Sequence, residues 1–316
     1  MKFLLPQGIG DSVWALHKIE DVAKKLKADS IEVYLNCSEE NETQVRALDF
    51  VRRFDFVNSV RMLPGISIHP TKYLDENGCY NYIPDGPTCF NNEQYYALMP
   101  NGHLERGHRL EDWLPEFEIN WNIMNHFKIS SKEAEFGETV KTALGGYAVF
   151  YLGPLAGNMF DGHNRDSLWT PQDWVDLGKQ IKLALGIEIV IVGAPYDWQY
   201  YSAFVKPLLH TQTVLCTELI SRTSIGELYA LTSRARFVIS YQSGVGIVSS
   251  YMGVPTGIFW RPKGNSISPN CYLSFEEEMA SAWVNPQMIA AGKHLPLIYY
   301  RHGVDYIMEQ ILKRGW

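Results

Sequence analysis

Apolar residues follow two patterns in the first half of the chain, short continuous runs and stretches with a spacing of three and four. The runs predict strands at 2–5, 31–36 and 57–63. After Asp11, apolar positions recur through residues 13–26 and predict an amphipathic helix. Residues 43–54 predict a second helix. Strand and helix alternate, which is typical of a parallel sheet covered by helices.

The same alternation returns in the second half. Thr170 and Pro171 suit the cap and the first position of a helix. The run 187–193 is apolar almost throughout, as expected for a strand covered on both faces. Strands are predicted at 147–153, 187–193, 213–217, 236–241 and 254–260, and helices at 171–185, 198–209, 224–235, 245–252 and 304–314.

Two stretches do not fit the alternation. The first, 64–110, is rich in Pro, Gly, Asn and Tyr, and a loop of this length inside a compact domain usually carries function. We interpret it as an insertion near the binding cleft that contains a hairpin. Its aromatic residues suit stacking on a sugar or base, or the packing of an irregular subdomain. The second stretch, 131–146, is interpreted as a polar linker.

We therefore predict an α/β fold of two Rossmann-like, doubly wound domains that face each other across a cleft. The first covers 1–143 and includes the insertion, and the second covers 144–300. Ligands of open parallel sheets bind beyond the carboxyl ends of the strands, so we expect the active site in the cleft.

Composition supports a globular protein of this size. The chain has 316 residues, enough for two domains of about 150 residues each. It has no apolar run near the roughly 20 residues that span a bilayer and only a short apolar stretch at its start, which favours the cytoplasm. Five scattered cysteines form no CxxC pair, which argues against a structural zinc site.

Charge is divided unevenly between the two halves. Residues 1–145 hold 15 Lys and Arg against 22 Asp and Glu, a net charge of −7, whereas residues 146–316 are balanced at 13 against 13. Binding to nucleic acid depends on neutralising phosphates with cationic side chains. The first half is therefore a poor platform for DNA or RNA.

Three turns between a strand and a helix carry candidate chemistry. The first contains Gly8, Gly10 and Asp11. Glycines let the backbone approach a ligand closely, and Asp11 suits either a general base or a helix cap. The second runs from 153 to 158 and is followed by Arg165, which could neutralise a diphosphate or lie solvated in a loop. The third, 240–246, has small residues that suit phosphate binding or a plain tight turn.

The order of these segments resembles the heptosyltransferase-like glycosyltransferases of family 9, which have the two-domain GT-B fold. The resemblance rests on GIGDSVWALHKI at the start, LGPLAG and NRDSLWTPQDWVDLGKQI after 150, IEIVIVGAP, and TSIGELYALTSRARFVISYQSGVGIVSSYMGVPTGIFW. It covers most of 147–260 and about the first 25 residues, but not 64–130. The last block is its most specific part.

The resemblance implies inverting sugar transfer from a nucleotide sugar, with Asp11 as the catalytic base. It places Arg165 near the donor phosphates and implies that the last helix, 301–316, packs back on the first domain. It implies no divalent metal, no DxD pair is present to hold one, and no cofactor besides the co-substrate is expected. The candidate donor-binding residues are Gly8, Gly10, Asn158, Arg165, Gly193, Thr223, Ser224, Glu227, Gln242, Ser243, Gly244, Val245 and Lys263.

Two departures from the family pattern leave alternatives open. Gln242 stands where the family usually has Asp, and Ile247 where it usually has His. These changes put ADP-heptose as donor in doubt and leave room for a protein that binds a nucleotide sugar without catalysis. Transfer to a modified base in DNA is a further alternative, which the acidic first half disfavours. A dehydrogenase or epimerase is disfavoured because no GxGxxG motif lies in the right context.

Overall fold

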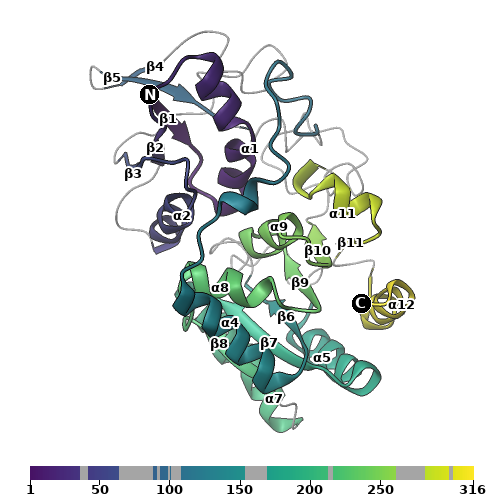
Figure 1. Ribbon diagram of the computed structural model, residues 1–316. Coiled ribbons are helices and arrows are strands. Elements are labelled where there is room, and N and C mark those ends of the chain that lie inside the picture. Colours follow the sequence, from purple (N-terminus) through teal and green to yellow (C-terminus); the bar gives the residue numbers. More distant parts are fainter. Residues whose placement is uncertain are drawn as a thin grey trace, which may run out of the picture. The chain divides into compact units, whose positions relative to one another are not determined.

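The structure is a computed structural model that describes residues 1–35, 42–63, 88–90, 93–98, 100, 108–153, 169–212, 216–260, 282–298 and 302–316. The chain forms two compact units (Figure 1). The first comprises Met1–Lys128 and Ser266–Trp283, and the second comprises Ile129–Asn265 and Val284–Trp316. The boundary thus falls between Lys128 and Ile129, earlier in the chain than the predicted 143/144.

The first unit contains a five-stranded sheet in the order β3-β2-β1-β5-β4. Strands β1, β2, β3 and β5 are parallel, and β4 pairs antiparallel with β5 at one edge. The predicted strands and helices of this half are confirmed. The elements are β1 (Lys2–Leu5), α1 (Ile9–Lys25), β2 (Glu32–Leu35), α2 (Glu42–Arg52), β3 (Ser59–Met62), β4 (Thr88–Phe90) and β5 (Glu93–Ala97).

The predicted insertion contributes to this sheet. The β4–β5 hairpin lies within it, and β5 pairs with β1 through Phe3 opposite Tyr96 and Leu4 opposite Ala97. The buried Tyr95 packs edge-on against Tyr34 of β2. This part of the stretch is therefore a strand of the domain core. Residues 64–87, 91–92, 99 and 101–107 of the stretch lie outside the described residues.

Helix α1 is held by an irregular segment nearly a hundred residues away, 113–120. The buried Lys18 ammonium donates to the carbonyl oxygens of Trp113 and Leu114. His17 Nδ1 lies 2.7 Å from the carbonyl oxygen of Asn120, and the Asn120 N–H donates back to the His17 carbonyl. On another part of α1, the Trp14 ring lies 5.9 Å from that of Trp283, which the chain returns to this unit. These contacts fix the helix that carries Asp11.

The second unit contains a six-stranded parallel sheet in the order β11-β10-β9-β6-β7-β8. The chain starts in the middle with β6, moves outward to β8, and then returns to build β9 to β11 on the other side. This is the doubly wound order, and it confirms the predicted fold class. The strands are β6 (Tyr147–Tyr151), β7 (Glu188–Gly193), β8 (Thr217–Ile220), β9 (Phe237–Tyr241), β10 (Thr256–Trp260) and β11 (His294–Ile298).

Helices cover both faces of this sheet (Figure 1). On one face pack α5 (Pro171–Leu185), α12 (Val304–Arg314), and the helical stretch η3 (Pro195–Asp197), α6 (Trp198–Tyr200), the π-helical η4 (Tyr201–Val205) and α7 (Lys206–Thr211). On the other pack α4 (Ser131–Leu144), α8 (Ile225–Thr232) and α9 (Gly244–Tyr251). Burial of both faces explains why the central strands are almost wholly apolar.

Several predictions of elements differ from the structure. The linker predicted at 131–146 is wrong, because α4 fills it and packs on α8 with Gly137 against the backbone of Ala230. Strand β8 lies later than predicted, and 213–215 are outside the described residues. The short elements η2 (Ile123–His126), α11 (Pro286–Ala290) and β11 were not predicted. Helix α12 belongs to the second unit, where its buried face packs against α5 and the second sheet. Its expected packing on the first domain stays a prediction.

Candidate functional site

The strand order locates a candidate site in the second unit. The chain reverses direction across the sheet between β6 and β9, and ligands of doubly wound sheets bind outside the carboxyl ends of the strands at this point. Beyond β9 lie residues 242–246, and beyond β6 lies Gly153. The turn that the sequence singles out at 240–246 is therefore at the position where the fold favours a ligand.

The first turn of α9 has backbone donors to offer. Ser243 caps the helix, and its side chain accepts from the Gly246 N–H at 3.4 Å. The N–H groups of Gly244 and Val245 have no acceptor among the described residues. A Cβ on Gly246 would lie 2.2 Å from the Ser240 hydroxyl oxygen, so only glycine fits there. These N–H groups lie at the positive end of the helix dipole, so the start of α9 suits an anion.

The other helices of the second unit offer less to an anion. Among its described helices of eight residues or more, α9 alone has no acidic residue in the first turn. Helices α4, α5 and α8 each begin with a full capping box, in which Glu133, Asp173 and Glu227 respectively fill the helix start. A phosphate at those starts would meet a carboxylate. The charges therefore direct a phosphate to α9.

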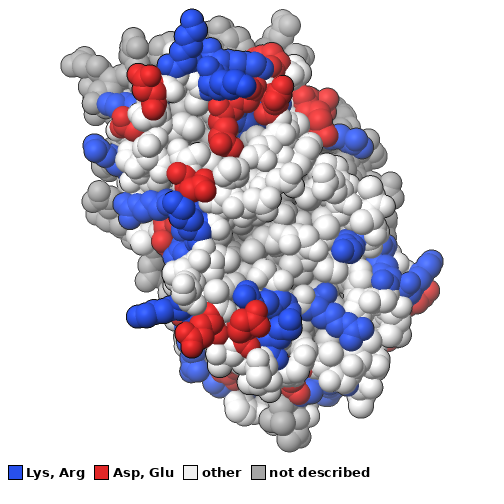
Figure 2. All heavy atoms as spheres, in the orientation of Figure 1, with Lys and Arg blue, Asp and Glu red and all other residues white. Residues whose placement is uncertain are grey.

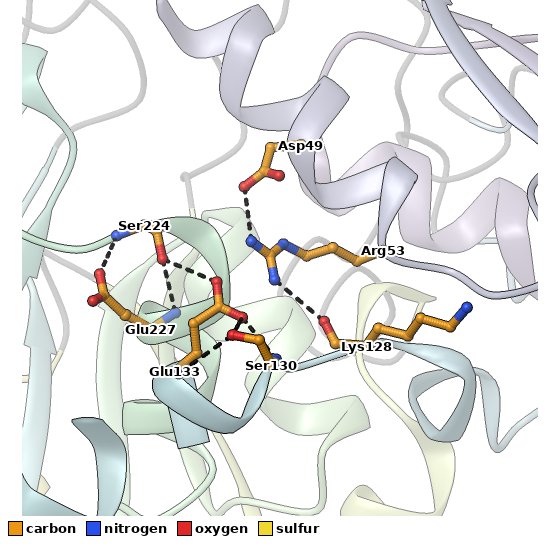
Figure 3. Close-up of polar contacts among 7 residues, drawn as sticks. All are labelled: Asp49, Arg53, Lys128, Ser130, Glu133, Ser224 and Glu227. Atoms are coloured by element: carbon orange, nitrogen blue, oxygen red, sulfur yellow. Dashed lines mark hydrogen bonds and ion pairs between the residues drawn. The ribbon is translucent and has the colours of Figure 1, made fainter. Parts of the chain in front are cut away.

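Figure 3 shows how the predicted residues Ser224 and Glu227 are used. The Ser224 N–H donates to Glu227 at 2.8 Å, and the Glu227 N–H donates to the Ser224 hydroxyl at 3.1 Å. The Ser224 hydroxyl also donates to Glu133 of α4 at 3.3 Å, which joins the starts of two packed helices. Both residues thus have a structural role in this unit. Their neighbour Thr223 is buried, and its hydroxyl has no partner among the described residues.

The same figure shows how the first unit ends. Arg53, just after α2, donates to Asp49 at 3.3 Å and to the carbonyl oxygen of Lys128 at 3.2 Å. Lys128 is the last residue of the first unit before the chain crosses to α4. The Arg53 guanidinium therefore links α2 to Lys128, the residue at which the chain leaves the first unit.

Asp11 lies in the first turn of α1, beyond the carboxyl end of β1. Gly8 is the N-cap residue, and a Cβ there would lie 2.5 Å from Asp11 Oδ2. The Ser12 hydroxyl donates to the Pro6 carbonyl at 2.9 Å and fixes the turn. The half-buried carboxylate therefore folds over the cap position, where the helix dipole stabilises its negative charge. Gly10 is buried in the same turn.

The remaining predicted residues divide into two groups. Gln242 is half-buried at the end of β9, and Ile247 is buried on the inner face of α9. Gly193 ends β7, where a Cβ would lie 3.0 Å from Asp197. Asn158, Arg165 and Lys263 lie outside the described residues.

The structure brings together three residues that were not predicted. At the carboxyl ends of β6 and β7, the Tyr151 hydroxyl donates to the buried Asp197 carboxylate at 3.4 Å, and the neighbouring Tyr196 contributes to the raised pKa of Tyr151. Asp197 also accepts from the Ala194 N–H at 2.7 Å. Burial and the neighbouring Asp197 raise the pKa of Tyr151 well above its ordinary value, so the phenol keeps its proton. The only sequence signal was the position of 195–197 directly after a buried strand.

The described residues hold no group of three or more His, Cys, Asp or Glu side chains placed to bind a metal ion. Nor does any helix in the described ranges combine the length and the apolar character needed to cross a membrane.

No protein-family model matches the sequence, and none of the curated proteins matches it. Solved structures do match. The ADP-heptose LPS heptosyltransferase II of E. coli is 12% identical, covers 99% of this chain and 98% of its own, and has a TM-score of 0.57. The family 9 glycosyl transferase of Veillonella parvula is 14% identical over 99% of this chain and 95% of its own, also at 0.57.

A third structure, the E. coli heptosyltransferase WaaC with ADP, is 11% identical over 99% of this chain and 100% of its own, with a TM-score of 0.53. The chain has the fold of these heptosyltransferases. The match spans nearly the full length of each protein, so both units and their order correspond. The heptosyltransferase fold agrees with the architecture predicted from the sequence motifs.

Proposed function

We propose that this chain is a glycosyltransferase that moves a sugar from a nucleotide-sugar donor to a hydroxyl group of a saccharide or related acceptor. The observation that carries the proposal is the start of α9. It combines two backbone N–H groups that have no acceptor among the described residues with a neighbouring glycine and a first turn without an acidic residue, at the point where a doubly wound sheet binds its ligand. The heptosyltransferase fold supports the same assignment.

In the proposed reaction Asp11 acts as the general base. The acceptor oxygen attacks the anomeric carbon while its proton passes to the Asp11 carboxylate. The bond between the anomeric carbon and the phosphate oxygen breaks, and the electron pair leaves with the nucleoside diphosphate. One displacement inverts the anomeric configuration. The α9 N–H groups, with Arg165 and Lys263, stabilise the charge on the departing diphosphate without a metal ion.

Two other functions follow from the same fold. A nucleotide-sugar-binding protein without catalysis is favoured by Gln242 and Ile247, which place no charge beside the donor turn. A transferase acting on DNA needs clustered Lys and Arg side chains. On the face drawn in Figure 2, the described basic and acidic side chains lie interspersed and form no continuous basic stripe. That surface disfavours DNA as the acceptor.

The first experiment is a thermal-shift screen with nucleoside diphosphates and nucleotide sugars. A ligand at about a hundredfold excess over its Kd adds roughly 2.7 kcal/mol of stability. We expect a clear rise in Tm with one nucleotide base. The absence of a shift with every nucleotide would contradict the proposal.

The second experiment separates enzyme from binding protein. Asp11→Asn keeps the size of the side chain and removes the base. We expect it to lower turnover by at least a hundredfold, the lower end of what general bases contribute, while the Kd of the donor stays unchanged. Asp29→Asn, at an exposed carboxylate of the same unit, is the matched control. Wild-type protein that binds donor but shows no turnover with a panel of glycans would favour the binding protein.

A further inference from the structure

The chain crosses between the two units three times. One crossing, after Asn265, lies outside the described residues. At another, Arg53 binds the carbonyl oxygen of Lys128 and Ser130 caps α4, so the ends are fixed to elements that carry no residue of the proposed reaction. The third crossing is the link 283–285, and its two ends are fixed to α1 and to α9.

The first end of the link is fixed to the helix that carries Asp11. Trp283 is 6% exposed, and its ring lies 5.9 Å from that of Trp14, which follows Asp11 in α1 by three residues. Neither indole N–H has a hydrogen-bond partner among the described residues. Packing of the two aromatic rings therefore holds this end of the link in place.

The second end of the link is fixed to the helix that offers N–H groups to a phosphate. The Asn285 N–H donates to the Ser250 hydroxyl in the last turn of α9 at 3.4 Å, and that hydroxyl donates to the Ile247 carbonyl oxygen at 2.7 Å. The Asn285 side chain accepts from the Gln287 N–H at 3.0 Å and caps α11. Both the backbone and the side chain of Asn285 are therefore held.

The link leaves little slack between its two ends. Only Val284 separates Trp283 from Asn285, and all three residues are buried. Two steps of extended chain span at most about 7 Å, so a shift at one end must move the other end or break a contact there. Sugar transfer depends on the spacing between the base and the donor, and a displacement of about 1 Å can lower the rate by about a hundredfold.

We propose that Trp283 and Asn285 are positioning residues of the transfer reaction, which tie the helix of the base Asp11 to the helix of the phosphate site. The inference rests on the proposed function. Neither residue contacts a substrate in this account, because each acts through the helix to which it is fixed. Loss of either contact should therefore lower kcat, while the Kd of the donor, which depends on the start of α9, stays unchanged.

The test removes one contact at each end of the link. Trp283→Leu removes the ring that packs on Trp14, and Ser250→Ala removes the acceptor of the Asn285 N–H. Release of ADP or UDP from ADP-glucose or UDP-glucose, with a panel of glycans as acceptors, gives kcat, and calorimetric titration gives the donor Kd and the number of donor sites. We expect kcat per donor site to fall about 10- to 100-fold in Trp283→Leu and about 3- to 10-fold in Ser250→Ala, the effect of one neutral hydrogen bond.

Two control variants separate a loss of stability from a loss of position. Ser249→Ala changes the neighbouring serine of α9, whose hydroxyl donates to the Val245 carbonyl oxygen instead. Trp316→Leu makes the same change as Trp283→Leu at a buried tryptophan that packs on Phe237, at the amino end of β9. Both controls should keep the wild-type kcat per donor site even where Tm falls. Trp283→Phe keeps an aromatic ring and should regain most of the kcat that Trp283→Leu loses.

The double variant, Trp283→Leu with Ser250→Ala, decides whether the two contacts act through one link. Effects at independent sites multiply, whereas a second break in one link should add little to the larger single loss. Losses that multiply, or an unchanged kcat per donor site in both single variants, would overturn the inference and leave the proposed function standing. A wild type that binds neither nucleotide sugar, or binds one without turnover, would overturn the proposed catalysis and the inference with it.

Discussion

Two glycines inside helices of the second unit, Gly178 in α5 and Gly137 in α4, have very different surroundings. Both are buried, and both stand in the middle of a helix. A Cβ on Gly178 would lie 3.7 Å from Ile189 and 4.0 Å from Phe150, which are ordinary contact distances. A Cβ on Gly137 would lie 2.7 Å from the backbone oxygen of Ala230 in α8. The two positions therefore form a matched pair for substitution by alanine.

We expect Gly178→Ala to stabilise the second unit. Alanine is favoured over glycine inside a helix by about 1 kcal/mol. The added methyl group also fills part of a small apolar cavity that Gly178 lines together with Phe150, Leu152, Trp174 and Ile189. Burial of one methyl group adds at most about 0.8 kcal/mol. A net gain of about 1 kcal/mol corresponds to a rise in Tm of about 2–4 °C for a domain of this size.

Gly137→Ala brings the same gain in helix propensity but forces α4 away from α8. Overpacking of this kind costs about 1–3 kcal/mol, and a backbone oxygen cannot move aside as a side-chain end can. We expect a net loss of about 1 kcal/mol and a lower Tm. Differential scanning calorimetry of both variants beside the wild type measures the two shifts. Shifts of the same sign would refute the reasoning from Cβ distances.

Two further predictions concern titration and capping. Burial lowers the pKa of His17 to about 4, so between pH 6.5 and 4 the unfolded chain binds a proton that the folded chain does not, and the free energy of unfolding should fall as the pH drops through this range. Urea unfolding of His17→Gln should show a smaller fall over the same range. An equal fall in the variant and the wild type would contradict this prediction. Ser224→Ala should lower the free energy of unfolding by about 1 kcal/mol through loss of the α8 cap, and Ser224→Gly by only a few tenths. Equal losses in the two Ser224 variants would show that the cap contributes little.

Local signals explain which elements the sequence could predict. Thr170 and Pro171 begin α5 as expected, because a cap and a first-turn proline act within a few residues. The strand at 188–193 was equally clear, since burial on both faces leaves a continuous apolar run. Helix α4 was missed because its charged sequence hides a narrow apolar face that depends on contact with α8. Strand β11 was not predicted because it contains Pro296, and a proline fits within a sheet mainly in an edge strand such as this one.

In the candidate site too, the sequence predicts the residues with local signals and misses those that tertiary contacts bring together. The turns at Asp11 and at 240–246 were visible because small residues cluster directly after apolar runs. The spacing of Glu227 from Ser224 also indicates a capping box, whereas the family resemblance implies ligand binding for the same two residues. The bond between Tyr151 and Asp197 joins residues 46 positions apart at two strand ends. No spacing rule predicts it, because only the sheet register brings the two together.

The return of Trp283 to the first unit has a consequence for how the protein is made. Domains generally fold as units during synthesis, beginning from the N-terminus. Here the first unit cannot close over Trp14 until the ribosome has added residues 266–283, which follow nearly all strands of the second sheet. Strands β6 to β10 of the second sheet are therefore made while the first unit still lacks residues 266–283, and β11 follows them. Each unit thus depends on a segment that is made after most of the other unit.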